Sequence, residues 1–219
     1  AASDVYKRQG LLLMVATDRI SAFDVVLPTA IPEKGVVLSH ISAFWFARTE
    51  SILPNHFVCM ATNKAALGSI SLPDISEAIA RRSTVVKRAE RLDVECIARG
   101  YITGSAWGEY TKTGTVHGIK MPAGLMEGDQ FPEPLFPPTP KAEEGHDMPM
   151  SLKELGDMVG TDMAKRLGEK TIEIYATSDA YARSKGIIIA DTKLEFGIVN
   201  GELTVTVSYT HLTLPTSDL

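Results

Sequence analysis

The sequence predicts a mixed fold of helices and paired strands, arranged as one large domain or two small lobes. The chain has 219 residues, whereas one domain typically contains roughly 100–200 residues. Two segments rich in β-forming residues, 84–90 and 93–101, are separated by charged residues, which is typical of paired strands. Two other segments, 36–53 and 151–183, carry apolar residues at the spacing of amphipathic helices.

The first half of the chain begins with a strand and a helix. Residues 10–17 form a continuous apolar run, the pattern of a strand buried on both faces. In segment 36–53, one helical stripe holds apolar residues, and Pro54 closes the segment. The residues of this stripe are Leu38, Ile41, Trp45 and Ile52. We therefore expect this stripe to face the core.

The second half alternates extended and helical segments. Six of the chain's 12 prolines fall within 121–140, so this segment is expected to be extended and to form neither a helix nor a central strand. Segment 151–183 predicts one helical region with a stripe of Met163, Leu167, Ile174 and Tyr181. A short buried strand over 187–191 should follow. The apolar-rich segment 193–199 then precedes Asn200-Gly201, a strong hairpin signal.

Composition excludes several classes of protein. Lys and Arg total 22 and Asp and Glu total 27, so the formal net charge is −5, with both signs interspersed. This argues against a protein that coats nucleic acid, because such binding needs a basic face. The longest apolar runs, 11–16 and 186–190, are far shorter than the roughly 20 residues that span a bilayer. Cys59 and Cys96 form no C-x-x-C pair. We expect a cytoplasmic protein with neither a nucleic-acid nor a membrane partner.

The most informative local pattern lies between Gly186 and Gly197. Alternation along a strand sends Asp191, Lys193 and Glu195 to one side. Two carboxylates flanking an ammonium suit Mg²⁺ that is held by carboxylate oxygens and bridged to nucleotide phosphates, with the lysine as a point charge. A cross-strand ladder of ion pairs on a solvated face has the same pattern. The sequence alone leaves both interpretations open.

Two loops could bind anions. Asp18, Arg19 and Ser21 follow the first apolar run, where loops often hold ligands, but the residues alone favour an Asx turn with a surface ion pair. Arg99 and Ser105 place a guanidinium near the start of a helix that Ser105 is expected to cap. Free backbone N–H groups at the start of this helix, the Ser105 hydroxyl and the Arg99 guanidinium could together bind a phosphate. The alternative interpretation is an ordinary turn.

Taken together and in order, four segments resemble those of the SAICAR synthase family of purine biosynthesis. They are 16–28, 94–107, 141–147 and 191–197. The resemblance implies an ATP-dependent ligase that joins carboxyaminoimidazole ribonucleotide to L-aspartate with ATP and Mg²⁺. It also implies an α+β fold of two lobes with antiparallel sheets and an ATP cleft similar to those of protein kinases and ATP-grasp enzymes.

The resemblance also implies roles for individual residues. The magnesium ligand is Glu195, with Asp191 and Lys193 beside the reacting groups. The ribonucleotide phosphate contacts Arg99 and Ser105. The first substrate loop contains Asp18, Arg19 and Ser21, and Asp147 contacts the aminoimidazole end of the ribonucleotide. A hinge that contacts the adenine contains Arg91, Leu92 and Asp93.

The same resemblance predicts the domain organisation. We expect an ATP-binding lobe over 10–100 and a substrate and metal lobe over 101–205, each truncated, with non-native tails at 1–9 and 206–219. The strand over 11–17 would then have an open edge, and this chain would have little activity. Two alternatives remain: another small-molecule kinase that uses Mg-ATP, and a non-catalytic nucleotide-binding module.

Overall fold

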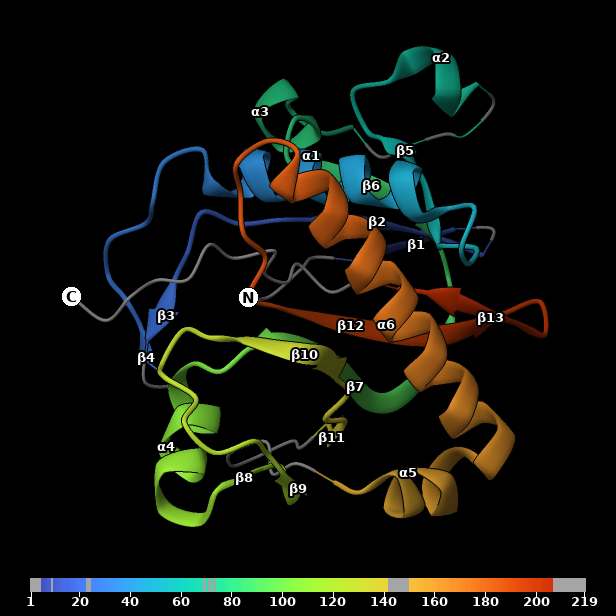
Figure 1. Cartoon of the computed structure of the whole chain (residues 1–219). Coiled ribbons are helices and arrows are strands. Elements are labelled where there is room, and N and C mark those ends of the chain that lie inside the picture. Colours follow the sequence, from blue (N-terminus) through green and yellow to red (C-terminus); the bar gives the residue numbers. More distant parts are fainter. Residues whose placement is uncertain are drawn as a thin grey trace. The chain divides into compact units, whose positions relative to one another are not determined.

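The computed structural model describes residues 5–8, 10–22, 25–68, 70, 72, 74–141 and 150–206 (Figure 1). The described chain forms two compact units. The first contains the residues up to Arg91 and those from Gly197 onward, and the second contains Leu92–Phe196. Helices and antiparallel strands make up both units, which confirms the predicted α+β class.

The first unit is built on a four-stranded antiparallel sheet of order β1-β2-β6-β5. These strands are β1 (Val5–Arg8), β2 (Leu11–Val15), β5 (Phe57–Met60) and β6 (Ser83–Lys87). The predicted strand over 10–17 corresponds to β2. Its edge is not open as we expected, because β1 pairs with β2 from Val5↔Met14 to Arg8↔Leu11.

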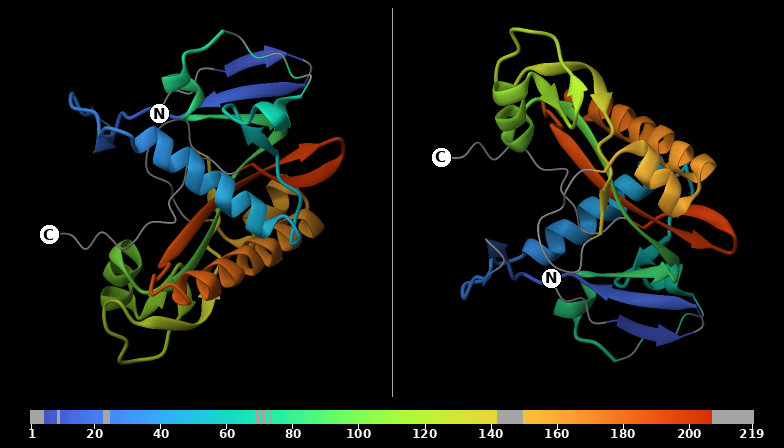
Figure 2. Two further views of the ribbon diagram at one scale, coloured as in Figure 1. Left: turned by 90° about the horizontal axis from the view of Figure 1, so that it is seen from above. Right: turned by 90° about the horizontal axis from the view of Figure 1, so that it is seen from below.

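Helix α1 (Lys34–Thr49) packs against β5 and β6 of this sheet (Figure 2). Its predicted inward stripe was wrong, because Ile41 is exposed and the buried residues are Gly35, Ser39, Phe46 and Thr49. The two hydroxyls tolerate burial because they donate to backbone carbonyls: Ser39 to Arg82 at 3.0 Å and Thr49 to Trp45 at 2.8 Å. The remaining elements are β3 (Ser21–Ala22), β4 (Val25–Val26), α2 (Lys64–Leu67) and α3 (Glu77–Ala80).

The second sheet has the order β10-β7-β12-β13, with β11 also paired to β7. Its strands are β7 (Glu90–Tyr101), β10 (Gln130–Leu135), β11 (Thr139–Pro140), β12 (Asp191–Val199) and β13 (Glu202–Val205). The predicted pairing of 84–90 with 93–101 was wrong. Strand β6 pairs with β2 and β5, whereas β7 belongs to this second sheet. A segment rich in β-forming residues predicts a strand but does not identify the strand with which it pairs.

The proline-rich segment and the hairpin agree with the sequence. Strand β10 contains Pro132 and Pro134 and lies at the edge of its sheet, where a missing N–H is tolerated. Asn200 and Gly201, with φ of 52° and 83°, form the turn between β12 and β13. The predicted strand over 187–191 was wrong, since Ile187 and Ile188 are about half exposed and regular pairing begins only at Asp191.

Three longer helices belong to the second unit: α4 (Gly104–Thr113), α5 (Leu152–Val159) and α6 (Thr161–Arg183). Helix α6 lies along one face of the sheet (Figure 2). The predicted helical region over 151–183 is interrupted at Gly160, whose φ is 89°. Ser151 begins α5 with a reciprocal capping box to Glu154. A short hairpin of β8 (Thr115–Val116) and β9 (Ile119–Lys120) follows α4. No helix among the described residues is long and apolar enough to span a membrane.

Candidate active site

The charged side of β12 carries buried carboxylates that are paired with lysines. Glu195 is 7% exposed, and its Oε1 lies 2.6 Å from Nζ of Lys141. Lys193 forms an ion pair with Glu95 of β7, which is also 7% exposed. The ion pairs expected from the ladder interpretation are present, but the carboxylates are buried and do not belong to a solvated face. Such burial requires paired charges, because an isolated buried carboxylate is strongly disfavoured.

The negative charges of this cluster affect the pKa of a neighbouring thiol, that of Cys96. Burial raises the pKa of Cys96 to about 12, the negative charges of Glu195 and Glu95 add to this effect, and the nearby Thr171 hydroxyl opposes it. A thiol with so high a pKa stays protonated and unreactive at neutral pH. This raised pKa argues against a nucleophilic role for Cys96.

Two members of this cluster were missed in the sequence. Glu95 stands within the otherwise apolar stretch Val94–Ala98, and a charged residue inside a buried strand was the signal that could have identified it. Lys141 was noted only as part of the segment 141–147. Its ammonium reaches Glu195 because β11 pairs with β7 and its backbone N–H donates to the carbonyl of Asp93 at 3.1 Å.

The donor set suits a magnesium ion that is bound largely by nucleotide phosphates. Among the described residues, no group of three or more His, Cys, Asp or Glu side chains could hold a metal. Mg²⁺ typically keeps one or two protein carboxylates and completes its octahedron with phosphates and water. Glu195 fits as such a single carboxylate, and the Lys141 ammonium is the cation that neutralises it here.

Arg99 and Asp191 come together on neighbouring strands of the second sheet. Burial lowers the pKa of the Arg99 guanidinium, and the nearby Asp191 carboxylate opposes that shift. The Nε of Arg99 is buried and has no hydrogen-bond partner in the described part of the chain. Ser105 is exposed in the first turn of α4. It is not the cap we expected, because Thr103 occupies that position without a side-chain bond.

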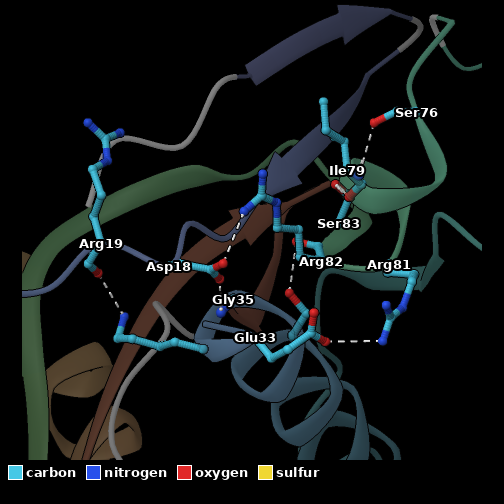
Figure 3. Close-up of polar contacts among 11 residues, drawn as sticks. Asp18, Arg19, Glu33, Gly35, Ser76, Ile79, Arg81, Arg82 and Ser83 are labelled. Carbon is cyan, nitrogen blue, oxygen red and sulfur yellow. Dashed lines mark hydrogen bonds and ion pairs between the residues drawn. The ribbon is translucent and has the colours of Figure 1, made fainter. Parts of the chain in front are cut away.

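The first loop holds the start of α1 in the first unit (Figure 3). The Oδ1 of Asp18 accepts a hydrogen bond from the backbone N–H of Gly35 at 2.8 Å, and Oδ2 lies 3.6 Å from Nη1 of Arg82. The carbonyl of Arg19 accepts from Nζ of Lys34 at 3.1 Å, while the exposed Arg19 guanidinium points away from Asp18. Asp18 therefore has a structural role: it lies in the preceding loop and caps the N-terminus of α1.

The remaining expected site residues lie in three other segments. Ser21 is exposed in β3, where it pairs with Val26. At the beginning of β7, Arg91 and Asp93 are exposed and Leu92 is half-buried. Asp147 lies outside the described residues.

Comparisons with known proteins agree on one family. The sequence model of SAICAR synthetase matches residues 1–207. Phosphoribosylaminoimidazole-succinocarboxamide synthase from Thermodesulfovibrio yellowstonii is 48% identical over 200 residues, which cover 91% of this chain and 68% of that protein. The protein of the same name from Saccharomyces cerevisiae is 47% identical over 201 residues, covering 89% and 66%. A solved SAICAR synthase of that yeast, complexed with SAICAR, has a TM-score of 0.79 at 40% identity, covering 95% of this chain and 74% of the other.

Proposed function

Since this chain belongs to the SAICAR synthetase family, we propose that it carries out that family's reaction in purine biosynthesis. In this reaction, ATP drives the joining of carboxyaminoimidazole ribonucleotide to the α-amino group of L-aspartate. The observation that carries the proposal is the buried cluster on β12 and β7, where Lys193 pairs with Glu95 and Lys141 with Glu195. Phosphoryl transfer needs such fixed charges of both signs in a site from which water is excluded.

The reaction must first make the substrate carboxylate a better acyl donor, because a free carboxylate would have to expel an oxide. Transfer of the γ-phosphoryl group forms a bond from a carboxylate oxygen to phosphorus and breaks the bond to the bridging oxygen, releasing ADP. The amine of aspartate then attacks the acyl carbon and phosphate leaves, while the amine gives up a proton. The protein contributes mainly position and charge neutralisation.

The charged side of β12 has the residue types for the first step. Glu195 would hold the Mg²⁺ that accompanies ATP, and this ion supplies positive charge to the phosphate oxygens when bound. Lys193, held in place by Glu95, places an ammonium beside the transferring group, and Asp191 lies next to Arg99 on the neighbouring strand. Lys141 leaves Glu195 in this proposal and becomes available as a second ammonium.

Substrate contacts complete the proposal. Arg99 and Ser105 bind the phosphate of the ribonucleotide, and Asp147 contacts its aminoimidazole end. Arg19 and Ser21 contact substrate from the first loop, which Asp18 holds against α1. The adenine lies against Arg91, Leu92 and Asp93. ATP, L-aspartate and the ribonucleotide are the proposed small-molecule partners.

The experiment is to measure ADP release by this protein with ATP, Mg²⁺ and the ribonucleotide, in the presence and absence of L-aspartate. We expect ADP release to depend on aspartate and the product to contain the new amide. ADP release that needs the ribonucleotide but not aspartate would indicate a small-molecule kinase. Nucleotide binding without any turnover would indicate a non-catalytic module.

A further inference from the structure

His117 occupies a turn that is costly for a histidine. It joins β8 to β9, and both central residues are left-handed, with φ of 51° for His117 and 74° for Gly118. Such turns favour Asn and Gly, since a side chain with a Cβ is strained at positive φ. The chain accepts this strain at one of only three non-glycine residues with positive φ among those described, the others being Glu33 and Asn200.

The carboxylate of Glu109, on α4, stabilises this turn. Its Oε2 accepts from the backbone N–H of His117 at 2.9 Å, and its Oε1 accepts from that of Gly118 at 3.1 Å. The hydroxyl of Thr115 donates to Oε1 at 2.8 Å. The carboxylate thus accepts three hydrogen bonds from this turn and positions the histidine through its backbone, and no hydrogen bond joins it to the ring nitrogens.

The ring of His117 is left without a partner beside a cation. Both ring nitrogens are buried and make no hydrogen bond within the described chain, and the Nε of Arg99 is in the same condition. A buried polar group that stays unpaired destabilises the fold, because it has lost its hydrogen bonds to water without replacement. Burial lowers the pKa of His117, the Arg99 charge lowers it further, and Glu109 opposes the shift. Buried, unpaired nitrogens on two side chains whose charges influence each other, one of them a cation, indicate a site for an anion.

We propose that His117 binds the ribonucleotide phosphate together with Arg99, and that its ring takes up a proton when this anion arrives. The inference rests on the proposed function, which assigns that phosphate to Arg99. Before binding, burial and the charge of Arg99 favour the neutral form of the ring. A phosphate dianion supplies negative charge to both groups and an acceptor for the buried N–H donors.

The pH dependence follows from the charged groups around the ring. Arg99 from β7 opposes protonation, and Glu109 from α4 favours it but is occupied by the turn. The bound phosphate reverses this balance and raises the pKa of the ring. Affinity for the phosphate should therefore fall as pH rises from below the free pKa to above the bound one. A phosphate ester also titrates near pH 6, so the relevant quantity is the difference from a variant without the imidazole.

The experiment uses the full 219-residue chain with ribose 5-phosphate and inorganic phosphate as probes. NMR follows the ring nitrogens of His117, and calorimetry in two buffers of different ionisation enthalpy measures proton uptake. We expect the pKa of the ring to rise by about one unit or more on binding. His117→Asn keeps a residue that tolerates positive φ, and it should weaken ribose 5-phosphate about 10-fold or more and abolish the additional proton uptake. The exposed His40 supplies the control His40→Asn, which should change neither quantity.

Two outcomes would overturn the proposal, and they separate it from the proposed function. If Arg99→Lys weakens ribose 5-phosphate but His117→Asn does not, and the ring does not titrate with the ligand, the role of His117 is wrong while the phosphate site stands. If neither variant weakens binding, the phosphate assignment itself is wrong. Should His117→Asn fail to fold, His117→Gly retains the turn and the same comparison applies.

Discussion

At the scale of single residues, Gly100 allows close packing beside the segment that leads into β12. A Cβ at this position would lie 1.8 Å from the hydroxyl oxygen of Tyr175. That hydroxyl donates to the carbonyl of Ile189 at 2.8 Å, and the N–H of Gly100 donates to the carbonyl of Ala190 at 2.9 Å. These two bonds fix the segment that leads into Asp191. The glycine beside Arg99 is thus needed for close packing rather than for a turn.

Substitution of Glu195 tests the proposed magnesium contact. Glu195→Gln keeps the shape but removes the charge, so Mg-ATP should bind or react less well by about 10- to 150-fold, the equivalent of one charge-assisted contact. The measurement is ADP release and nucleotide affinity as functions of Mg²⁺ concentration. Glu202→Gln, at an exposed position of β13, is the matched control. Identical Mg²⁺ dependence in the two variants would remove Glu195 from the site.

Substitution of Arg99 tests the proposed phosphate contact separately. Arg99→Lys keeps the positive charge but loses the planar fork that can bind phosphate through two hydrogen bonds. Binding of the ribonucleotide should weaken by about 10-fold or more, while binding of ATP should be spared. The measurement is the affinity of the variant for the ribonucleotide and for ATP, each determined by titration. Equal weakening of both would indicate a folding defect or a misplaced site.

The limits of sequence reasoning are clear from these side chains. Alternation along one strand was sufficient to predict that Asp191, Lys193 and Glu195 share a side. Their partners Glu95 and Lys141 were not predicted, because they come from a different strand and a loop, and only the pairing of strands brings them close. His117 was missed for a different reason. No local pattern shows that the ring nitrogens of a half-buried histidine in a hairpin turn are shielded from water.

At the scale of elements, the start of α1 depends on close contact with the first loop. The residue before the helix, Glu33, makes no side-chain cap, and Asp18 supplies the carboxylate instead. This requires a glycine at position 35. A Cβ there would lie 2.5 Å from the carbonyl oxygen of Ala16 and 3.1 Å from Oδ1 of Asp18.

Gly35→Ala should therefore separate the helix from the loop. We expect it to destabilise the fold by about 1–3 kcal/mol, the usual cost of overpacking. Gly108→Ala is the matched control, because nothing lies within 4 Å of a Cβ at that position of α4. There the gain in helix propensity should stabilise by about 0.5–1 kcal/mol. Urea unfolding followed by circular dichroism measures both changes, and effects of the same sign would contradict the packing explanation.

Element boundaries were predictable where a local residue sets them. The turn at Asn200-Gly201 and the edge position of the proline-containing β10 follow from backbone chemistry alone. The inward face of α1 did not, because Ser39 and Thr49 are buried through hydrogen bonds to carbonyls that the sequence does not show. The interruption of 151–183 at Gly160 was missed because apolar residues continue at helical spacing through it.

At the scale of the molecule, the fold class was accessible from the order of four motifs, whereas the strand pairing was not. Strands β6 and β7 are separated by two residues yet belong to different sheets. The reason is that both are buried and each has neighbours from distant parts of the chain. Long-range pairing of this kind is determined by the whole chain, and a window of about ten residues contains too little information to determine it.

The stability of the first unit should depend on pH through one buried histidine. His56 is 6% exposed, its ring centroid lies 5.5 Å from that of Phe46, and its backbone N–H donates to the carbonyl of Val205 at 3.1 Å. Burial lowers the pKa of His56 from the ordinary 6.5 to about 4. The folded protein therefore keeps this ring neutral at pH values where the unfolded chain protonates it.

The contribution of His56 to stability is fully present above pH 6.5, and it is lost as pH falls from there through about 4. The total loss is at most about 3–4 kcal/mol, at 1.36 kcal/mol for each pKa unit between 6.5 and about 4. Carboxylates also titrate at the lower end of this range, so the test is a difference between variants. His56→Leu should flatten the pH dependence of the urea midpoint between pH 6.5 and 4, whereas His40→Leu, at an exposed position, should leave it unchanged. If all three proteins lose stability in parallel, the buried ring is not the group that responds to acid.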